Sequence, residues 1–115
     1  MLRVYIAGPY SATDVLTVFE NMRRGMVLAT QARQFGFAPF CPWMDFMYYF
    51  VNIGKPFDLE NCYEYSLAWL KVSDCVLFTD NWKQSPGAIK EYNYAIEEKI
   101  PVFYSLSDLV YSESL

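Results

Sequence analysis

Short apolar segments alternate with longer amphipathic ones along this 115-residue chain, and no other feature constrains its fold as strongly. The apolar segments lie at residues 2–7, 37–40, 75–79 and 102–104, and they are rich in the β-branched and aromatic residues typical of buried strands. Apolar residues recur between them at steps of three and four. This period predicts helices over about residues 15–35, 59–72 and 87–99, with a short helical turn at 107–111.

Strands that alternate with helices predict an α/β domain with a parallel sheet. We expect a doubly wound fold of the Rossmann or flavodoxin type, in which helices flank a sheet of four to five strands. Neither a linker nor a repeat interrupts the chain, so residues 1–115 are expected to form a single domain.

The first helix carries the clearest pattern of the chain. The segment Ser11-Ala12-Thr13-Asp14 matches a capping box and predicts the start of this helix, and Gly36 suits its C-cap. The stripe expected to face the core consists of Val15, Val18, Phe19, Met22, Met26 and Ala29.

Composition narrows the possible functions. The chain has no histidine, and Cys41, Cys62 and Cys75 form no C-x-x-C pair. Zinc sites of the Cys/His type and histidine-based catalysis are therefore excluded, and no metal or cofactor is expected.

The net charge is −4 and no run of Lys or Arg exists, which argues against a long nucleic acid as partner. No apolar stretch approaches the roughly 18 residues of a membrane span, and an odd number of thiols suits a reducing compartment, so we expect a cytoplasmic protein.

Ligands of doubly wound folds bind beyond the carboxyl ends of the strands. The segment Gly8-Pro9-Tyr10-Ser11 occupies such a position after the first strand. Gly8 opens the turn, Tyr10 offers a ring that can stack on a flat base, and Ser11 offers a hydroxyl. An ordinary strand–helix turn with a capping serine explains the same residues equally well.

A second segment, Ser85-Pro86-Gly87-Ala88-Ile89-Lys90-Glu91, follows the third strand and contains a helix start. Ser85 lies at the N-cap, and Gly87 allows a ligand to approach the backbone. The free N–H groups at this end of the helix favour a phosphate or another anion. Glu91, about one turn further on, can be aimed at a sugar carbon. The spacing is equally compatible with a capping serine and a solvated glutamate.

Two ordered groups of residues carry a resemblance to a known family. The first is Val4-Tyr5-Ile6-Ala7-Gly8-Pro9-Tyr10 with Asn21; the second is Ser73-Asp74-Cys75-Val76-Leu77, then Trp82-Lys83-Gln84-Ser85-Pro86-Gly87-Ala88 and Glu91. Together they resemble the nucleoside 2-deoxyribosyltransferase superfamily, in particular its small bacterial and phage members, and they are similar to deoxynucleoside 5′-monophosphate N-glycosidases. The resemblance covers most of the chain apart from residues 43–57.

This resemblance implies a reaction in which Glu91 attacks the anomeric carbon of a 2′-deoxynucleoside or its 5′-monophosphate and forms a covalent glycosyl–enzyme. The sugar then passes to another base or to water. An aspartate at the position of Ser85 binds a sugar hydroxyl in the transferases, whereas a serine there contacts the 5′-phosphate in the hydrolases, so a nucleotide is implied here. The implied substrate-binding residues are Gly8, Tyr10, Ser85, Gly87 and Ala88.

One departure from the family concerns the leaving base. Many active relatives have an aspartate at the position of Ser66, where it protonates or orients the base. Asp45, Glu64 and Asp80 are the candidate replacements in this chain. The departure motivates an alternative, a non-catalytic module that binds or senses nucleotides on the same fold. A plain α/β interaction domain without a ligand is a third possibility.

The aromatic content of 19% is high for so short a chain and suggests a homo-oligomer. The resemblance implies that a neighbouring subunit completes the pocket. The aromatic segment at residues 43–50 is expected to supply that contact.

Overall fold

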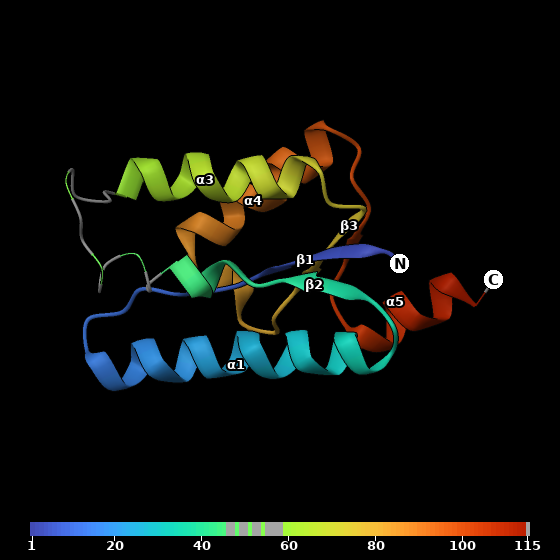
Figure 1. Ribbon diagram of the computed structural model, residues 1–115, viewed down its shortest axis with the longest axis horizontal. Helices are drawn as coiled ribbons and strands as arrows, with labels where there is room; N and C mark the ends of the chain where they lie inside the picture. The colour runs from blue at the N-terminus through green and yellow to red at the C-terminus, as the bar shows by residue number, and fades with distance from the viewer. Residues whose placement is uncertain (46–47, 49–50, 52–53, 55–58, 115) are drawn as a thin grey trace.

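The computed structural model describes residues 1–45, 48, 51, 54 and 59–114. A parallel sheet in the order β2-β1-β3-β4 forms its centre (Figure 1). The strands are β1 (Arg3–Ala7), β2 (Ala38–Phe40), β3 (Cys75–Phe78) and β4 (Val102–Phe103). The described helices are α1 (Val15–Gln34), α3 (Leu59–Lys71), α4 (Pro86–Glu97) and α5 (Leu106–Glu113), with short 3₁₀ helices η1 (Pro42–Asp45) and η2 (Trp82–Gln84). The predicted α/β fold is confirmed, and the four strands and the four α-helices begin and end within two residues of their expected positions.

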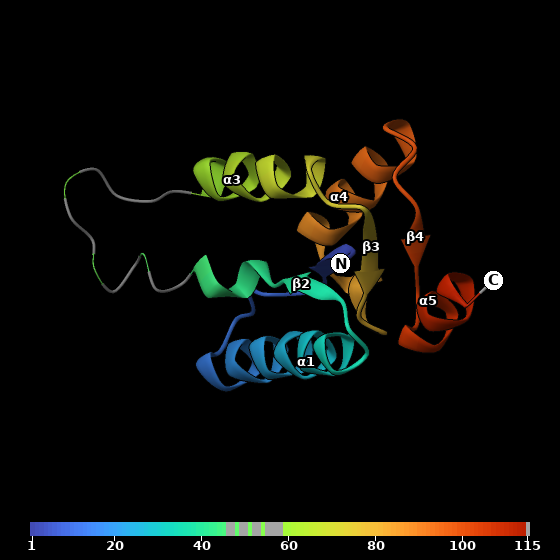
Figure 2. The same cartoon turned by 45° about the vertical axis from the view of Figure 1, so that its right-hand side comes forward.

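Helices cover both faces of the sheet because its central strands bury side chains on both sides. Val4 and Ile6 of β1 pack with α1 and α5 in one apolar cluster. Tyr5 and Ala7, which point to the opposite face, pack with α3 and α4 in a second cluster. Figure 2 shows the resulting layers, with α3 and α4 above the sheet and α1 and α5 below it. None of the described helices is long and apolar enough to cross a membrane.

The strand order places a crevice at the carboxyl ends of β1 and β3. The chain leaves β1 through α1 toward β2, and then returns through α3 to β3 on the other side of β1. The two connections diverge between these neighbouring strands, which is where doubly wound folds bind ligands.

The buried face of α1 differs from the predicted stripe. Met22 and Ala29 are buried as expected, but Val15, Phe19 and Met26 are 65%, 57% and 48% exposed. The physical reason is the Trp43 ring, which packs directly on the helix. A Cβ atom at Gly25 would lie 2.9 Å from that ring, so the helix turns its small residues toward the core.

The start of α1 also differs from the prediction. Asp14 is the N-cap, and its carboxylate accepts hydrogen bonds from both the backbone N–H and the hydroxyl of Thr17, at 2.8 and 2.7 Å. Ser11 is exposed and precedes the helix. Asp14 rather than Ser11 is the N-cap residue, because Thr17 offers two hydrogen-bond donors to the Asp14 carboxylate. At the other end, Gly36 follows the helix with a φ of +91°, as the C-cap prediction requires.

Candidate active site

A cavity of about 420 Å³ lies at the carboxyl ends of β1 and β3. Its walls come from the β1–α1 turn, η1, α3 and the first two turns of α4. The described residues that line it are Gly8, Tyr10, Ser11, Pro42, Trp43, Cys62, Tyr63, Ser66, Ser85, Pro86, Gly87, Ala88 and Glu91. The volume suits a ligand of nucleotide size.

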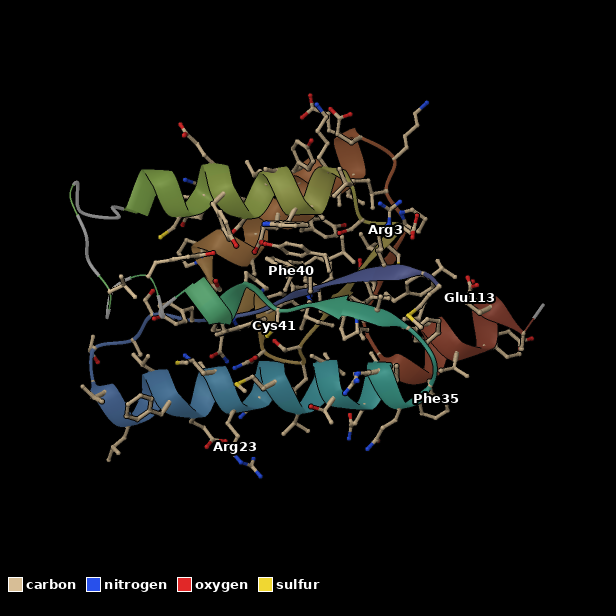
Figure 3. The ribbon with its side chains drawn as sticks, viewed as in Figure 1. Arg3, Arg23, Phe35, Phe40, Cys41 and Glu113 are labelled. Atoms are coloured by element: carbon tan, nitrogen blue, oxygen red, sulfur yellow. The ribbon has the colours of Figure 1, made fainter. Side chains whose placement is uncertain are left out.

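Glu91 is held in the wall of this cavity rather than exposed on its helix. Its exposed fraction is 7%, and the hydroxyl of Tyr5 donates a hydrogen bond to its Oε2 atom. Tyr5 itself is fully buried in β1, with its ring centroid 5.8 Å from that of Phe40. Figure 3 shows Phe40 between β2 and α3. The strand and its packing therefore fix the hydroxyl, and the hydroxyl fixes one face of the carboxylate.

The N-terminus of α4 forms a second wall. The Ser85 Oγ atom caps the helix by accepting a hydrogen bond from the Ala88 N–H at 3.1 Å, as the sequence predicts. Gly87 lies against Tyr63, because a Cβ atom there would be 3.1 Å from the Tyr63 ring. The Lys90 ammonium lies 4.3 Å from the centroid of the same ring. The positive end of the helix thus makes this side of the cavity favourable to an anion.

The turn after β1 closes the cavity from the other side. The Trp43 Nε1–H donates to the carbonyl oxygen of Pro9 at 2.7 Å, and the Asn21 amide donates to that of Tyr10 at 3.3 Å. Gly8 packs on Thr79 of the neighbouring strand end, with no room for a side chain. These contacts hold Tyr10 and Ser11 at the cavity.

The structure brings most of the predicted site residues together. Gly8, Tyr10, Ser85, Gly87, Ala88 and Glu91 all line the cavity. Ser66, the residue that departs from the family pattern, lines it as well and is buried.

The proposed proton donors are placed differently. The Asp80 side chain is 82% exposed, forms an ion pair with Arg24 at 2.9 Å, and is not among the lining residues. Arg24 belongs to α1 and Asp80 to the loop after β3, and their ion pair lies on the surface. Glu64 is exposed on α3. Asp45 ends η1, but its side chain lies outside the described part of the chain.

Sequence reasoning missed three residues that shape the site. Tyr5 orients the glutamate, Trp43 supports the first turn, and Tyr63 covers Gly87. Trp43 was expected to contact another subunit, yet it is only 2% exposed. Tyr49 and Phe50 of the same predicted contact lie outside the described residues, whereas Tyr48 is half exposed and its hydroxyl lies 3.3 Å from that of Tyr65. A tyrosine within an otherwise apolar strand was the available signal for Tyr5, because its buried hydroxyl must find a partner.

We expect a thiol reagent to modify Cys62 first. Burial, together with the charges of Asp74 and Glu113, raises the pKa of Cys75 to about 12, so its thiol stays protonated near neutral pH. Cys41 is buried, whereas Cys62 is half-buried at the cavity. Mass spectrometry after brief alkylation at about pH 8 should find one adduct, at Cys62. Reaction at Cys75 before Cys62 would contradict this, and unfolding in urea should expose all three thiols.

The described residues include no group of three or more His, Cys, Asp or Glu side chains able to hold a metal ion. A search of curated proteins finds no match to this chain. A protein family described as "Domain of unknown function (DUF4406)" matches residues 2–104, from the strand before the first site turn to the end of the sheet. Because this match includes both walls of the cavity and most of the sequence, the chain belongs to the DUF4406 family.

Proposed function

We propose that this protein cleaves the N-glycosidic bond of a 2′-deoxynucleoside 5′-monophosphate, or of the deoxynucleoside, with Glu91 as the nucleophile. The observation that carries the proposal is the Glu91 carboxylate, buried in the wall of a nucleotide-sized cavity and aligned by the Tyr5 hydroxyl. A solvated glutamate on the surface of the helix would instead be exposed. The resemblance of the two motifs to the nucleoside 2-deoxyribosyltransferase superfamily supports the same assignment.

In the proposed reaction, a Glu91 oxygen attacks C1′ of the sugar. The C1′–N bond breaks and its electron pair leaves with the base, which takes up a proton from solvent water, while an ester forms between C1′ and the glutamate. Water then attacks C1′ and releases the sugar, or a second base does so and completes a transfer. In both cases the carboxylate is restored. Tyr5 holds the carboxylate during both steps, which keeps the attacking oxygen in one orientation.

The proposed site of the 5′-phosphate is the start of α4. Ser85 precedes Glu91 by six residues, which corresponds to about 9 Å along a helix, a separation that a deoxyribose 5′-phosphate can span. The helix end favours the phosphate charge there. Tyr10 offers an aromatic ring to the base on the opposite wall.

The direct test is base release. Purified protein is incubated with each deoxynucleoside 5′-monophosphate and each deoxynucleoside, and free base is measured by chromatography. We expect release from at least one nucleotide, and addition of a second base distinguishes transfer from hydrolysis. The absence of release from the whole panel would contradict the proposal.

The Ser85→Asp variant is expected to shift the preference from nucleotide to nucleoside. Aspartate still caps the helix, but its charge repels a phosphate held at the same helix end. We expect the ratio of kcat/KM for nucleotide over nucleoside to fall about tenfold or more, which corresponds to roughly 1.4 kcal/mol of lost discrimination. Ser85→Asn is the matched control, since asparagine caps equally well and carries no charge. An unchanged ratio in Ser85→Asp would remove the phosphate assignment.

One observation favours a second candidate, a module that binds nucleotides without turning them over. Glu91 is the only carboxylate among the described residues that line the cavity, and Ser66 stands where many active relatives have an aspartate. Protection of Cys62 from alkylation by a deoxynucleotide, with no base released over days, would support this candidate over the enzyme.

The proposed location is the cytoplasm. Cys41, Cys62 and Cys75 are not joined in disulfide bonds in the structure, which suits a reducing compartment.

A further inference from the structure

The outer face of α1 carries several large apolar side chains that the fold leaves uncovered. Val15, Leu16, Phe19, Met26 and Val27 are 65%, 79%, 57%, 48% and 39% exposed. Figures 1 and 2 show α1 as the lower border of the molecule, with the sheet on one side of it only. Contiguous apolar surface of this kind marks an interaction site more often than a solvated helix.

The side chains of this face leave a shallow depression of about 590 Å³ along the helix. Phe19, Met26 and Val27 line it, together with Arg23 and polar residues of the following turns. Ridges and depressions of one helix are the surface into which the ridges of another helix pack. The shape therefore suits a helix as the occupant.

The charges on this face identify which helix fits. Glu20 and Arg23 lie about one turn apart in the first half of α1, and both are exposed. Neither forms an ion pair within the described part of the chain. Figure 3 shows the Arg23 side chain pointing away from the sheet. A twofold axis close to Met22 makes two copies of α1 antiparallel and brings Glu20 of each copy beside Arg23 of the other. The same axis places the apolar residues that precede Glu20 in one copy beside the apolar residues that follow Arg23 in the other copy.

We propose that the outer face of α1 is a dimer interface, on which a second copy of this chain packs through its own α1 in an antiparallel arrangement. The face is self-complementary in charge and in apolar pattern, as a twofold interface requires. A helix of 20 residues is about 30 Å long, so one helix pair buries less than the standard interface of about 1,600 Å². The dimer is therefore expected to dissociate on dilution, with a dissociation constant in the micromolar range. This inference does not depend on the proposed function.

The first test is sedimentation velocity of the full chain over about 1–200 µM, where the wild type should pass from monomer to dimer. Phe19→Asp places a charge in the apolar depression and should leave a monomer throughout. Ile96→Asp is the matched control, because Ile96 is similarly exposed, at 52%, but lies on α4 on the opposite face of the sheet. Circular dichroism establishes that both variants are folded. A wild type that stays monomeric, or a Phe19→Asp variant that still dimerises, would overturn the proposal.

A charge exchange tests the geometry itself. Glu20→Arg sets arginines against one another across the axis, and Arg23→Glu does the same with glutamates, so each should weaken dimerisation about tenfold. The double variant Glu20→Arg/Arg23→Glu restores both pairs and should return to within about threefold of the wild type. A mixture of the two single variants should form heterodimers more readily than either forms homodimers. If the double variant and the mixture dimerise as weakly as the single variants, this antiparallel contact is excluded.

Discussion

The Glu91→Gln variant should release base at least about a hundredfold more slowly than the wild type, because an amide cannot form the glycosyl ester that the proposed reaction requires. The substitution keeps the size of the side chain and leaves an oxygen that can accept the hydrogen bond from Tyr5. The fold should therefore survive and the loss should appear in kcat. The measurement is chromatographic base release under single-turnover conditions, which separates chemistry from product release.

Glu97→Gln on the same helix is the matched control. Glu97 is exposed, so removal of its charge should leave the rate of base release unchanged. Rapid acid quenching of the wild type with substrate should yield a protein whose mass includes a deoxyribosyl phosphate, attached at Glu91. The adduct should be absent from Glu91→Gln. Retention of wild-type activity in this variant would show that another residue is the nucleophile.

The Gly8→Ala variant is expected to lose about 2 kcal/mol of unfolding free energy, roughly 8 °C in the midpoint of thermal unfolding. The added Cβ atom would lie 2.3 Å from the Thr79 Oγ1 atom and 2.9 Å from its Cγ2 atom. Thr79 cannot move away easily, because its backbone N–H donates to the carbonyl oxygen of Ala7 at 2.9 Å. The clash must therefore separate the ends of β1 and β3. Urea denaturation followed by circular dichroism gives the free energy.

The second substitution Thr79→Ala relieves this clash and makes the cause testable. It removes both atoms that the new methyl group would meet most closely. The double variant should be more stable than the sum of the single losses implies, by about 1 kcal/mol. If the two losses simply add, the cost of Gly8→Ala has another origin.

The sequence pattern was sufficient for the elements of the fold and for one end of the site. Short apolar runs located the strands and the period of three to four residues located the helices, because both record which side chains are buried. Ser85 and Gly87 were identifiable from the chemistry of a helix start, which is local in sequence.

The sequence pattern could not predict the features that depend on contacts between distant segments. The inward face of α1 was mispredicted because Trp43 selects the glycine face of the helix, and nothing within the helix indicates where that ring will pack. Asp80 was a reasonable candidate by position, but its side chain is exposed and pairs with Arg24 of α1, a contact between distant segments. The burial of Glu91 follows from Tyr5, and only the assembled sheet brings the two together.

The hydrogen bond between Tyr5 and Glu91 spans 86 positions of the chain. The two residues belong to different halves of the sequence, so neither half can assemble the site by itself. Contacts between residues so far apart in the sequence form slowly in folding, since a long loop must close before they can stabilise the structure. Enzymatic activity, once established, would therefore report completion of folding, and partly folded states that retain most of their helices would be silent in the assay.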